Sequence, residues 1–517
     1  MRVRRDRWTP AGVAFAGGVA AFLSLPPIGW WPLGPVGLAG LCWSLGRAGA
    51  RLRFACGALF GAGLLAPGLW WLLGFTGPGY PIAVVVLAAV YGAGAALVPR
   101  GPGRWAAFPA AVAGAELTVD MWPFGGVPMA ELSQGQALGP LLGVARLAGA
   151  VGVTAAAALA GAGLCALVEW RSRRGTSPWT AVACLAAAVV VAVGGALAPD
   201  GGAPVGTLNV AAVQGGGPRG VRAALSGNAD RVFQAQVTAE AQVSPPVDLV
   251  VWPENVLELS GPLDGSGDDS TMRELAAEIG APIVAGVTVP VGTSYFLNEV
   301  FAWSPGGGRT GPVVKVHRVP FGEWIPLRGL LRHLADLSAV PRDEIGGHGG
   351  GVLGVPSPKV GPVAVLISYE VFFDERVLSG VRGGGRLVVV PTNASSYVSS
   401  QVPSMEVAAA RLRAVGTGRD LAQAAPTGFS ALVDHRGRVL ARSGLGTAAV
   451  LDGRLSLRRG FTVFDHAGLW LDRGLVLAGL VAGLLAGALR RRARPLPDGP
   501  RADQGDGEGG DRRTGSG

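Results

Sequence analysis

Long apolar stretches alternate with short arginine-bearing stretches through the first 200 residues of the chain. Most of them approach the length of about 20 residues that a helix needs to cross a bilayer. They cover residues 11–25, 32–45, 54–75, 80–98, 105–121, 148–170 and 178–197, and a last one covers 469–489. The pattern predicts a polytopic α-helical membrane protein with about eight spans.

Between residues 205 and 466 the pattern changes to short β-branched runs separated by amphipathic stretches. Runs such as Val388-Val389-Val390 lack polar alternation, which is typical of strands covered on both faces. We therefore expect one layered α/β domain here. Its predicted strands are 207–214, 248–252, 282–289, 296–304, 362–368 and 386–391, and its predicted helices are 220–243, 271–279 and 404–416.

The arginines predict how the chain is oriented. They cluster before the first apolar stretch and after the second, fourth, sixth and last, whereas the alternate loops carry little charge. Because Lys and Arg accumulate in cytoplasmic loops, we expect both termini inside the cell and the α/β domain outside, in a multi-pass protein of the cell membrane. The predicted parts are a membrane domain at 1–200, the α/β domain at 205–466, a transmembrane helix at 469–490 and a disordered cytoplasmic tail at 495–517.

The composition agrees with a membrane protein. Hydrophobic residues make up 49% of the chain and charged residues only 15%. The net charge of +9 comes from dispersed arginines rather than one basic patch, so no nucleic-acid partner is expected. All four cysteines lie in apolar stretches before residue 185, which argues against disulfides and a metal site. A nucleophile in the α/β domain must therefore be something other than a thiol.

Residues 327–340 place leucines at helical spacing, with Arg328, Arg332 and His333 between them. This pattern predicts a basic amphipathic helix. Such a helix either lies in the membrane surface or packs against its own domain.

Three β-branched runs of the α/β domain end in reactive side chains. Glu254 follows the first run, Lys315 the second, and Ser368-Tyr369-Glu370 the third. Strand ends that meet at one edge would bring a carboxylate, an ammonium and a hydroxyl together, as nucleophilic catalysis with a general base requires. Because Glu254 closes an apolar run, we expect burial to raise its pKa. A lone glutamate at a strand end is more often an ion-pair partner. The order of the three stretches favours a catalytic role for Glu254 instead.

The motifs around these residues are Trp252-Pro253-Glu254, then Lys315-Val316-His317-Arg318-Val319-Pro320-Phe321-Gly322-Glu323, then Ser368-Tyr369-Glu370, then Pro391-Thr392-Asn393. In this order they resemble the apolipoprotein N-acyltransferases, membrane enzymes of the nitrilase superfamily. The resemblance spans nearly the whole chain and implies an αββα sandwich for the α/β domain. It also implies transfer of a fatty acyl chain from phospholipid to the N-terminal S-diacylglyceryl-cysteine of apolipoproteins, without metal or organic cofactor.

The resemblance also implies roles for individual residues. Glu254 matches the base and Lys315 the group that stabilises the oxyanion, while Ser368 stands where the family has its nucleophilic cysteine. Glu323 and Glu370 match glutamates of the family's motifs and are expected to hold the site electrostatically, and Asn393 is a further match. Trp252 and Tyr369 are candidates for the wall of an acyl-chain pocket, although aromatic side chains at strand ends are core residues more often than ligand contacts. His317, close to Lys315, is expected to be structural.

The sequence departs from the family pattern at Ser368, at Ala394-Ser395-Ser396-Tyr397, and at Met405-Glu406, where the family has Gln-His. An alkyl hydroxyl is a much weaker acid than a thiol, so it must lose its proton during attack. Three functions therefore stay open. They are a serine-based acyltransferase, a catalytically silent relative that binds lipid or lipoprotein, and an amidase-like hydrolase that uses water as acceptor.

Overall fold

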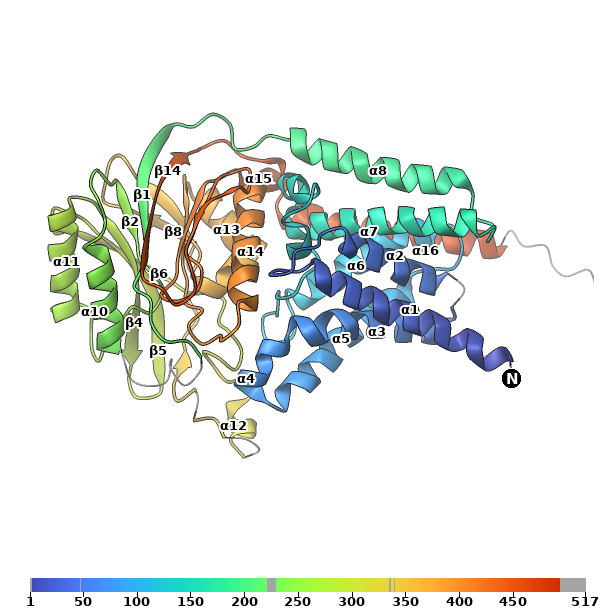
Figure 1. Cartoon of the computed structure of the whole chain (residues 1–517), viewed down its shortest axis with the longest axis horizontal. Coiled ribbons are helices and arrows are strands. Elements are labelled where there is room, and N and C mark those ends of the chain that lie inside the picture. Colours follow the sequence, from blue (N-terminus) through green and yellow to red (C-terminus); the bar gives the residue numbers. More distant parts are fainter. Residues whose placement is uncertain (1, 47, 221–228, 334–335, 339, 493–517) are drawn as a thin grey trace, which may run out of the picture.

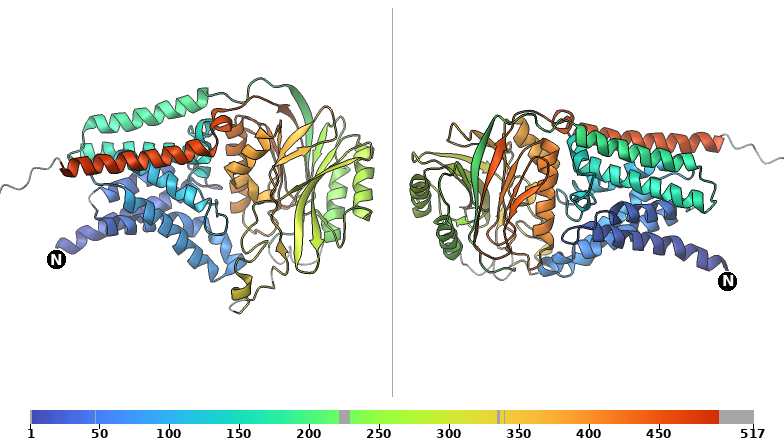
Figure 2. Two further views of the ribbon diagram at one scale, coloured as in Figure 1. Left: turned by 180° about the vertical axis from the view of Figure 1, so that it is seen from behind. Right: turned by 45° about the horizontal axis from the view of Figure 1, so that its top comes forward.

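A helical bundle and an α/β sandwich lie end to end in the computed structural model (Figures 1 and 2). The structure describes residues 2–46, 48–220, 229–333, 336–338 and 340–492. The bundle contains α1 (Arg2–Ser24), α2 (Leu33–Leu45), α3 (Ala50–Gly68), α4 (Leu73–Thr76), α5 (Gly79–Leu97), α6 (Arg104–Val119), α7 (Ala145–Arg171), α8 (Pro178–Leu197) and α16 (Leu469–Arg492). Each apolar stretch of the sequence thus forms a helix.

Fewer of these helices meet the requirements of a span than the sequence predicts. Among the described residues, four helical segments are long and apolar enough, namely α5, the segment Leu142–Arg171, α8 and the first 18 residues of α16. A fifth span results if α3 and the residues up to Thr76, which bend by 59°, count as one. Most of α1, and all of α2, are apolar but short, and α6 carries a buried arginine and glutamate. Length and composition therefore support four or five of the predicted eight spans.

Small residues let the bundle helices approach closely. A Cβ placed on Gly17 of α1 would lie 2.6 Å from the carbonyl oxygen of Gly37 in α2. In a bilayer, where helices gain little from the hydrophobic effect, such close backbone contact is a main source of association. The glycine- and alanine-rich composition of these helices is thus a packing feature.

The sandwich consists of two facing sheets. The first has the order β14-β1-β2-β4-β5-β6, with β3 and β7 at its side, and the second has the order β13-β12-β11-β10-β9-β8. The first comprises β1 (Gly206–Gln214), β2 (Leu249–Val251), β3 (Leu257–Glu258), β4 (Ile283–Val291), β5 (Tyr295–Trp303), β6 (Arg309–Val314), β7 (Asp343–Glu344) and β14 (Ala449–Leu457). The second comprises β8 (Val352–Gly354), β9 (Pro362–Val365), β10 (Val388–Pro391), β11 (Leu421–Ala424), β12 (Ala431–Val433) and β13 (Val439–Arg442). Valines and leucines from both sheets form one buried core between them.

Helices cover the outer face of each sheet. On the first sheet these are α10 (Ala229–Glu240) and α11 (Gly267–Ile279), which enclose a second core. On the second sheet they are α13 (Asp374–Arg382) and α14 (Gln401–Thr417), which face the bundle (Figure 1). A third core runs without interruption from the bundle to α14 and the second sheet. The four-layer αββα arrangement is present, and its α14 side is joined to the bundle.

Several local predictions need correction. The amphipathic helix over 327–340 is wrong: α12 (Arg328–Leu331) is a single turn, and residues 334, 335 and 339 lie outside the described residues. Arg328 is bound to Asp343 instead of presenting a basic face. The predicted strand 362–368 ends at Val365. The predicted helix 220–243 includes residues 221–228, which are also not described, as is the tail at 495–517.

Candidate active site

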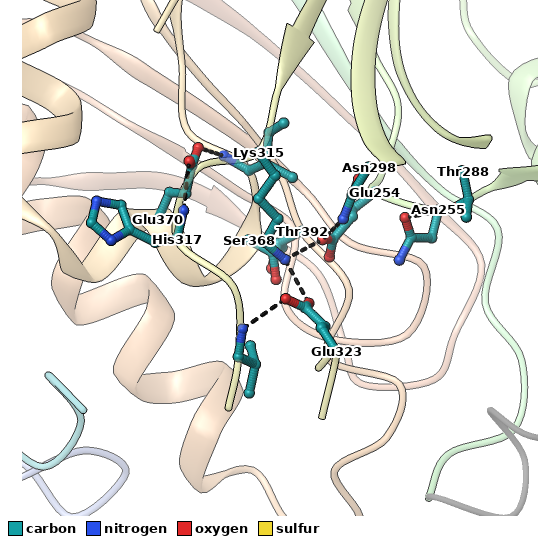
Figure 3. Close-up of polar contacts among 12 residues, drawn as sticks. Glu254, Asn255, Thr288, Asn298, Lys315, His317, Glu323, Ser368, Glu370 and Thr392 are labelled. Carbon is teal, nitrogen blue, oxygen red and sulfur yellow. Dashed lines mark hydrogen bonds and ion pairs between the residues drawn. The ribbon is translucent and has the colours of Figure 1, made fainter. Parts of the chain in front are cut away.

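Three strand ends meet where the two sheets adjoin. Glu254 follows β2, Lys315 follows β6, and Ser368 follows β9 of the opposite sheet (Figure 3). The turn that carries Glu254 lies directly against β4, because a Cβ on Gly286 would lie 2.6 Å from the Glu254 Cα. Only glycine at position 286 permits that approach, so the contact fixes the position of Glu254 relative to β4.

A buried ion cluster forms the centre of the site. The Lys315 Nζ lies 2.8 Å from Oε1 of Glu254 and 2.5 Å from Oε1 of Glu323. The Lys315 side chain is fully buried, and that of Glu254 is 2% exposed. Asn298 of β5 donates to the same Glu254 oxygen over 2.7 Å. The lysine therefore has two carboxylates as counter-charges.

Burial and mutual attraction set the charges in this cluster. Burial raises the pKa of Glu254, and the neighbouring Lys315 opposes that rise. Burial disfavours the Lys315 cation, but the carboxylates of Glu254 and Glu323 outweigh it and hold its pKa well above the usual value. Lys315 is thus a permanent cation, suited to stabilising an oxyanion. The expectation of a buried Glu254 with a raised pKa is confirmed.

Glu370 is a scaffold for the two strand ends. Its Oε1 accepts from the backbone N–H of Val316 at 2.7 Å, and its Oε2 accepts from the N–H of Ile367 at 2.9 Å. Arg376 of α13 completes the arrangement with an ion pair to Oε2. One buried carboxylate therefore fixes the backbone beside Lys315 relative to the backbone beside Ser368.

Ser368 lies at a sharp turn. Its φ of +50° is in the left-handed region, which non-glycine residues seldom adopt and which is concentrated at functional sites. The turn separates β9 from the 3₁₀ helix η4 (Ser368–Phe372). Arg413 holds that helix by donating to the carbonyls of Val371 and Phe372.

A small cavity of about 80 Å³ opens beside Ser368. Side chains of both the sandwich and the bundle line it, among them Glu323, Ser368, Tyr369, Asn393, Tyr397 and Glu406 from the sandwich and Phe75 and Met129 from the bundle. The Tyr369 hydroxyl also donates to the carbonyl of Gly126, in the loop after α6. The Ser368 side chain thus lies at the junction of the sandwich with the helical bundle.

Of the residues predicted from the sequence, Glu323, Ser368, Tyr369 and Asn393 line this cavity, whereas Glu254, Lys315, Glu370, Trp252 and His317 do not. Trp252, expected as a pocket wall, is fully buried on the other face of the first sheet, where its ring contacts Phe233 of α10 and its N–H donates to Glu240. Indole burial within the helix-covered core accounts for this difference. His317 stacks on Phe373 and pairs with Glu375, which agrees with a structural role.

Three residues of the site were not predicted. Asn298 holds Glu254, Arg376 holds Glu370, and Glu344 lies fully buried near Glu323. Burial raises the pKa of Glu344 well above its usual value, and Glu323 adds to that effect. A polar residue inside the apolar β5 run is the signal that marks Asn298. Among the described residues, no group of His, Cys, Asp and Glu is arranged to hold a metal ion.

Comparisons with known proteins cover both parts of the molecule. Residues 17–163 match the apolipoprotein N-acyltransferase N-terminal domain, and residues 209–460 match the carbon-nitrogen hydrolase family. The chain is 31% identical to the apolipoprotein N-acyltransferase of Mycolicibacterium smegmatis, over 93% of this chain and 86% of the relative. It is 29% identical to that of Geobacter metallireducens, over 88% of this chain and 91% of the relative. With that of Azotobacter vinelandii the identity is 29%, over 96% and 98%.

Proposed function

Since the chain belongs to the apolipoprotein N-acyltransferase family, we propose that it transfers a fatty acyl chain from phospholipid to the N-terminal S-diacylglyceryl-cysteine of apolipoproteins. The observation that carries this function is the buried Lys315 with its two carboxylates, beside a strained Ser368 on a cavity that the bundle helps to line. Because the polar site lies at the junction with apolar helices, both a membrane phospholipid ester and a polar acceptor can reach it.

In the first half-reaction, the Ser368 Oγ attacks the carbonyl carbon of the phospholipid ester. The carbonyl π electrons move to oxygen, and the resulting oxyanion is stabilised by the Lys315 ammonium. When the carbonyl re-forms, the bond to the glycerol oxygen breaks, and that oxygen takes up the proton that the Ser368 hydroxyl lost on attack. The products are an acyl ester on Ser368 and a lysophospholipid.

In the second half-reaction, the α-amine of the diacylglyceryl-cysteine attacks the acyl ester. Glu254 acts as general base and accepts the amine proton. The Ser368 oxygen leaves and receives the proton that Glu254 took from the amine, which restores both groups, and an amide bond remains on the lipoprotein. Glu323 shares the lysine with Glu254, and Tyr369 and Asn393 shape the cavity. Neither half-reaction requires a metal or an organic cofactor.

For the membrane arrangement we propose about eight spans, with both termini and the tail at 495–517 in the cytoplasm and the 205–466 domain outside. The arginine-bearing loops support this proposal because they gather at one end of the bundle. Arg100 donates to the Ala48 carbonyl, and Arg174 lies over the ring of Trp43. This end, where α1 begins and α16 ends, is the one remote from the sandwich (Figure 1).

The test is acyl transfer by the purified full-length protein, given phospholipid and a synthetic diacylglyceryl peptide. Mass spectrometry should detect N-acylated peptide and lysophospholipid in equal amounts. Free fatty acid without acylated peptide would instead indicate the hydrolase, and peptide binding without turnover would indicate the silent relative. Glu254→Gln should abolish product, whereas Glu274→Gln, an exposed carboxylate on α11, should not.

A further inference from the structure

Another buried carboxylate lines the cavity beside Ser368. Glu406 of α14 is 3% exposed and lines the same cavity as Ser368. Its Oε1 accepts a hydrogen bond from the Thr392 hydroxyl at 2.9 Å. Its Oε2 is buried and has no hydrogen-bond partner among the described residues. Neither half-reaction uses this carboxylate.

Thr392 connects that carboxylate to the serine. It follows β10, is fully buried, and places its Oγ1 3.3 Å from the Ser368 Oγ. Within the described part of the chain, this is the one hydrogen-bonding contact of the Ser368 hydroxyl. The distance is long for a hydroxyl pair, as is common in catalytic sites without substrate.

The direction of this chain of hydrogen bonds follows from the number of protons. An ionised carboxylate only accepts, so Thr392 must give its single proton to Glu406. Thr392 Oγ1 could donate either to Ser368 or to Glu406, but not to both. While Glu406 is ionised, Thr392 therefore accepts from Ser368, and the Ser368 hydroxyl is the donor. The chain therefore points from Ser368 through Thr392 to Glu406, which is the direction in which a proton must leave an attacking serine.

Glu254 is engaged elsewhere. The same Oε1 of Glu254 accepts from both Lys315 and Asn298, and no hydrogen bond joins Glu254 to Ser368 among the described residues. Glu254 thus lacks, in this structure, a direct contact through which it could take the Ser368 proton. Glu254 remains available for the amine of the second half-reaction.

We infer that Glu406, acting through Thr392, accepts the Ser368 proton during formation of the acyl ester. This inference rests on the proposed function and assigns its first proton transfer to a different carboxylate. As the bond from Oγ to the acyl carbon forms, the Oγ proton moves to Thr392 and the Thr392 proton moves to Glu406. When the lysophospholipid leaves, its oxygen takes a proton back along the same path, so the relay is neutral over the half-reaction.

The environment of Glu406 gives the relay a pH dependence. Burial raises the pKa of Glu406 to about 7. Its hydrogen bond from Thr392 and the Lys315 cation act against burial, whereas Glu254 acts with it. Tyr397 and Glu323 line the same cavity. Because a base must be ionised, the reactivity of Ser368 should be low in acid and rise with pH through about 7.

The test uses a long-chain alkyl fluorophosphonate on the full-length protein, which needs no lipoprotein substrate. Attack by the Ser368 Oγ forms an O–P bond and expels fluoride, and the proton follows the relay. We expect labelling at Ser368 in the wild type, mapped by peptide mass spectrometry, and none in Ser368→Ala. Glu406→Gln and Thr392→Val should each slow labelling by about 10²-fold or more. Thr392→Ser, which keeps the hydroxyl, should restore most of the rate.

The pH profile and a matched control complete the test. The rise in labelling through about pH 7 should disappear in Glu406→Gln, whereas Glu278→Gln, an exposed carboxylate on α11, should keep the wild-type profile. Equal rates for wild type and Glu406→Gln, at matched thermal stability, would overturn the relay. So would an unlabelled wild type. If Glu406→Gln does not fold, the contrast between Thr392→Val and Thr392→Ser decides in its place.

The outcomes also separate the relay from the proposed function. Relay-dependent labelling of Ser368 without any N-acylated peptide would support the relay and refute acyl transfer to lipoprotein. Acylated peptide from a protein whose Glu406→Gln variant labels and turns over normally would support acyl transfer and refute the relay.

Discussion

Arg376 Nε donates to Oε2 of Glu370 over 2.9 Å, and both side chains are buried. The same carboxylate accepts backbone N–H groups from the segments that carry Lys315 and Ser368. The Glu370–Arg376 ion pair therefore links the backbone beside Lys315 to the backbone beside Ser368. The site depends on this scaffold as much as on the reacting groups themselves.

Glu370→Gln tests the scaffold. The amide leaves the Arg376 guanidinium buried without its counter-charge, which typically costs about 3–5 kcal/mol. We expect a clear loss of thermal stability in detergent together with loss of acyl transfer. The matched control is Glu375→Gln, whose half-exposed carboxylate pairs with His317 and should contribute less than about 1 kcal/mol. Equal effects of the two substitutions would contradict the scaffold role.

Lys315→Met tests the central cation. Loss of one oxyanion-stabilising group typically lowers turnover about 10²–10³-fold. The substitution also leaves Glu254 and Glu323 without their counter-charge, so burial raises the pKa of Glu254 further above its unfolded value. A raised carboxyl pKa removes stability as pH rises above the unfolded value of about 4.3. Thermal unfolding of the variant should therefore lie closer to wild type at pH 5 than at pH 8, and a constant difference would contradict this account.

The apolar pattern predicted the helices and the strands because the spacing of apolar residues within one helix or strand can be read from neighbouring positions of the sequence. Every predicted apolar stretch is helical, although the stretch at 54–75 is broken between α3 and α4, and all six predicted strands exist with shifted ends. The strand before Ser368 ends early because the residue takes a left-handed conformation, which no periodicity reveals. The order of the three motifs along the chain was also sufficient to predict that Glu254, Lys315 and Ser368 lie close together.

The failures concern partners that are distant in sequence. Trp252 stands beside Glu254 in the chain, yet it points into the helix-covered core and bonds to Glu240. Spacing in 327–340 suggested a long helix, whereas Arg328 is held by Asp343. The contact between Thr392 and Glu406 depends on how α14 packs on the second sheet, which the spacing of residues in the sequence does not reveal.

The proposed orientation is open to chemical labelling. Ser270 of α11 and Ser172, just after α7, are both exposed, so Ser270→Cys and Ser172→Cys are matched substitutions on opposite ends of the molecule. Each is introduced into a protein whose native cysteines, which are all buried, have been replaced. In intact cells a membrane-impermeant maleimide should label the Ser270→Cys protein alone, and both should react after lysis. Labelling of only the Ser172→Cys protein would reverse the orientation and remove the lipoprotein substrate from reach.

Ser368→Cys gives the sharpest test of the site. A thiol has a pKa near 8.5, so it ionises far more readily than a serine hydroxyl, and a thioester yields its acyl group to an amine more readily than an ester. With the Glu254–Lys315 pair still in place, we expect faster N-acylation of the peptide and an acyl-enzyme that neutral hydroxylamine cleaves. Ser368→Ala should abolish all transfer.

The same substitution separates the nucleophile from its surroundings. Because a thiol depends less on an outside base, Glu406→Gln should slow the Ser368→Cys protein less than it slows the protein with serine. No gain from Ser368→Cys, in a protein that unfolds at the wild-type temperature, would mean that the cavity around Tyr397 and Glu406 no longer admits the substrates. The chain would then act by binding lipid or lipoprotein. Retained activity in Ser368→Ala would mean that another group forms the acyl intermediate.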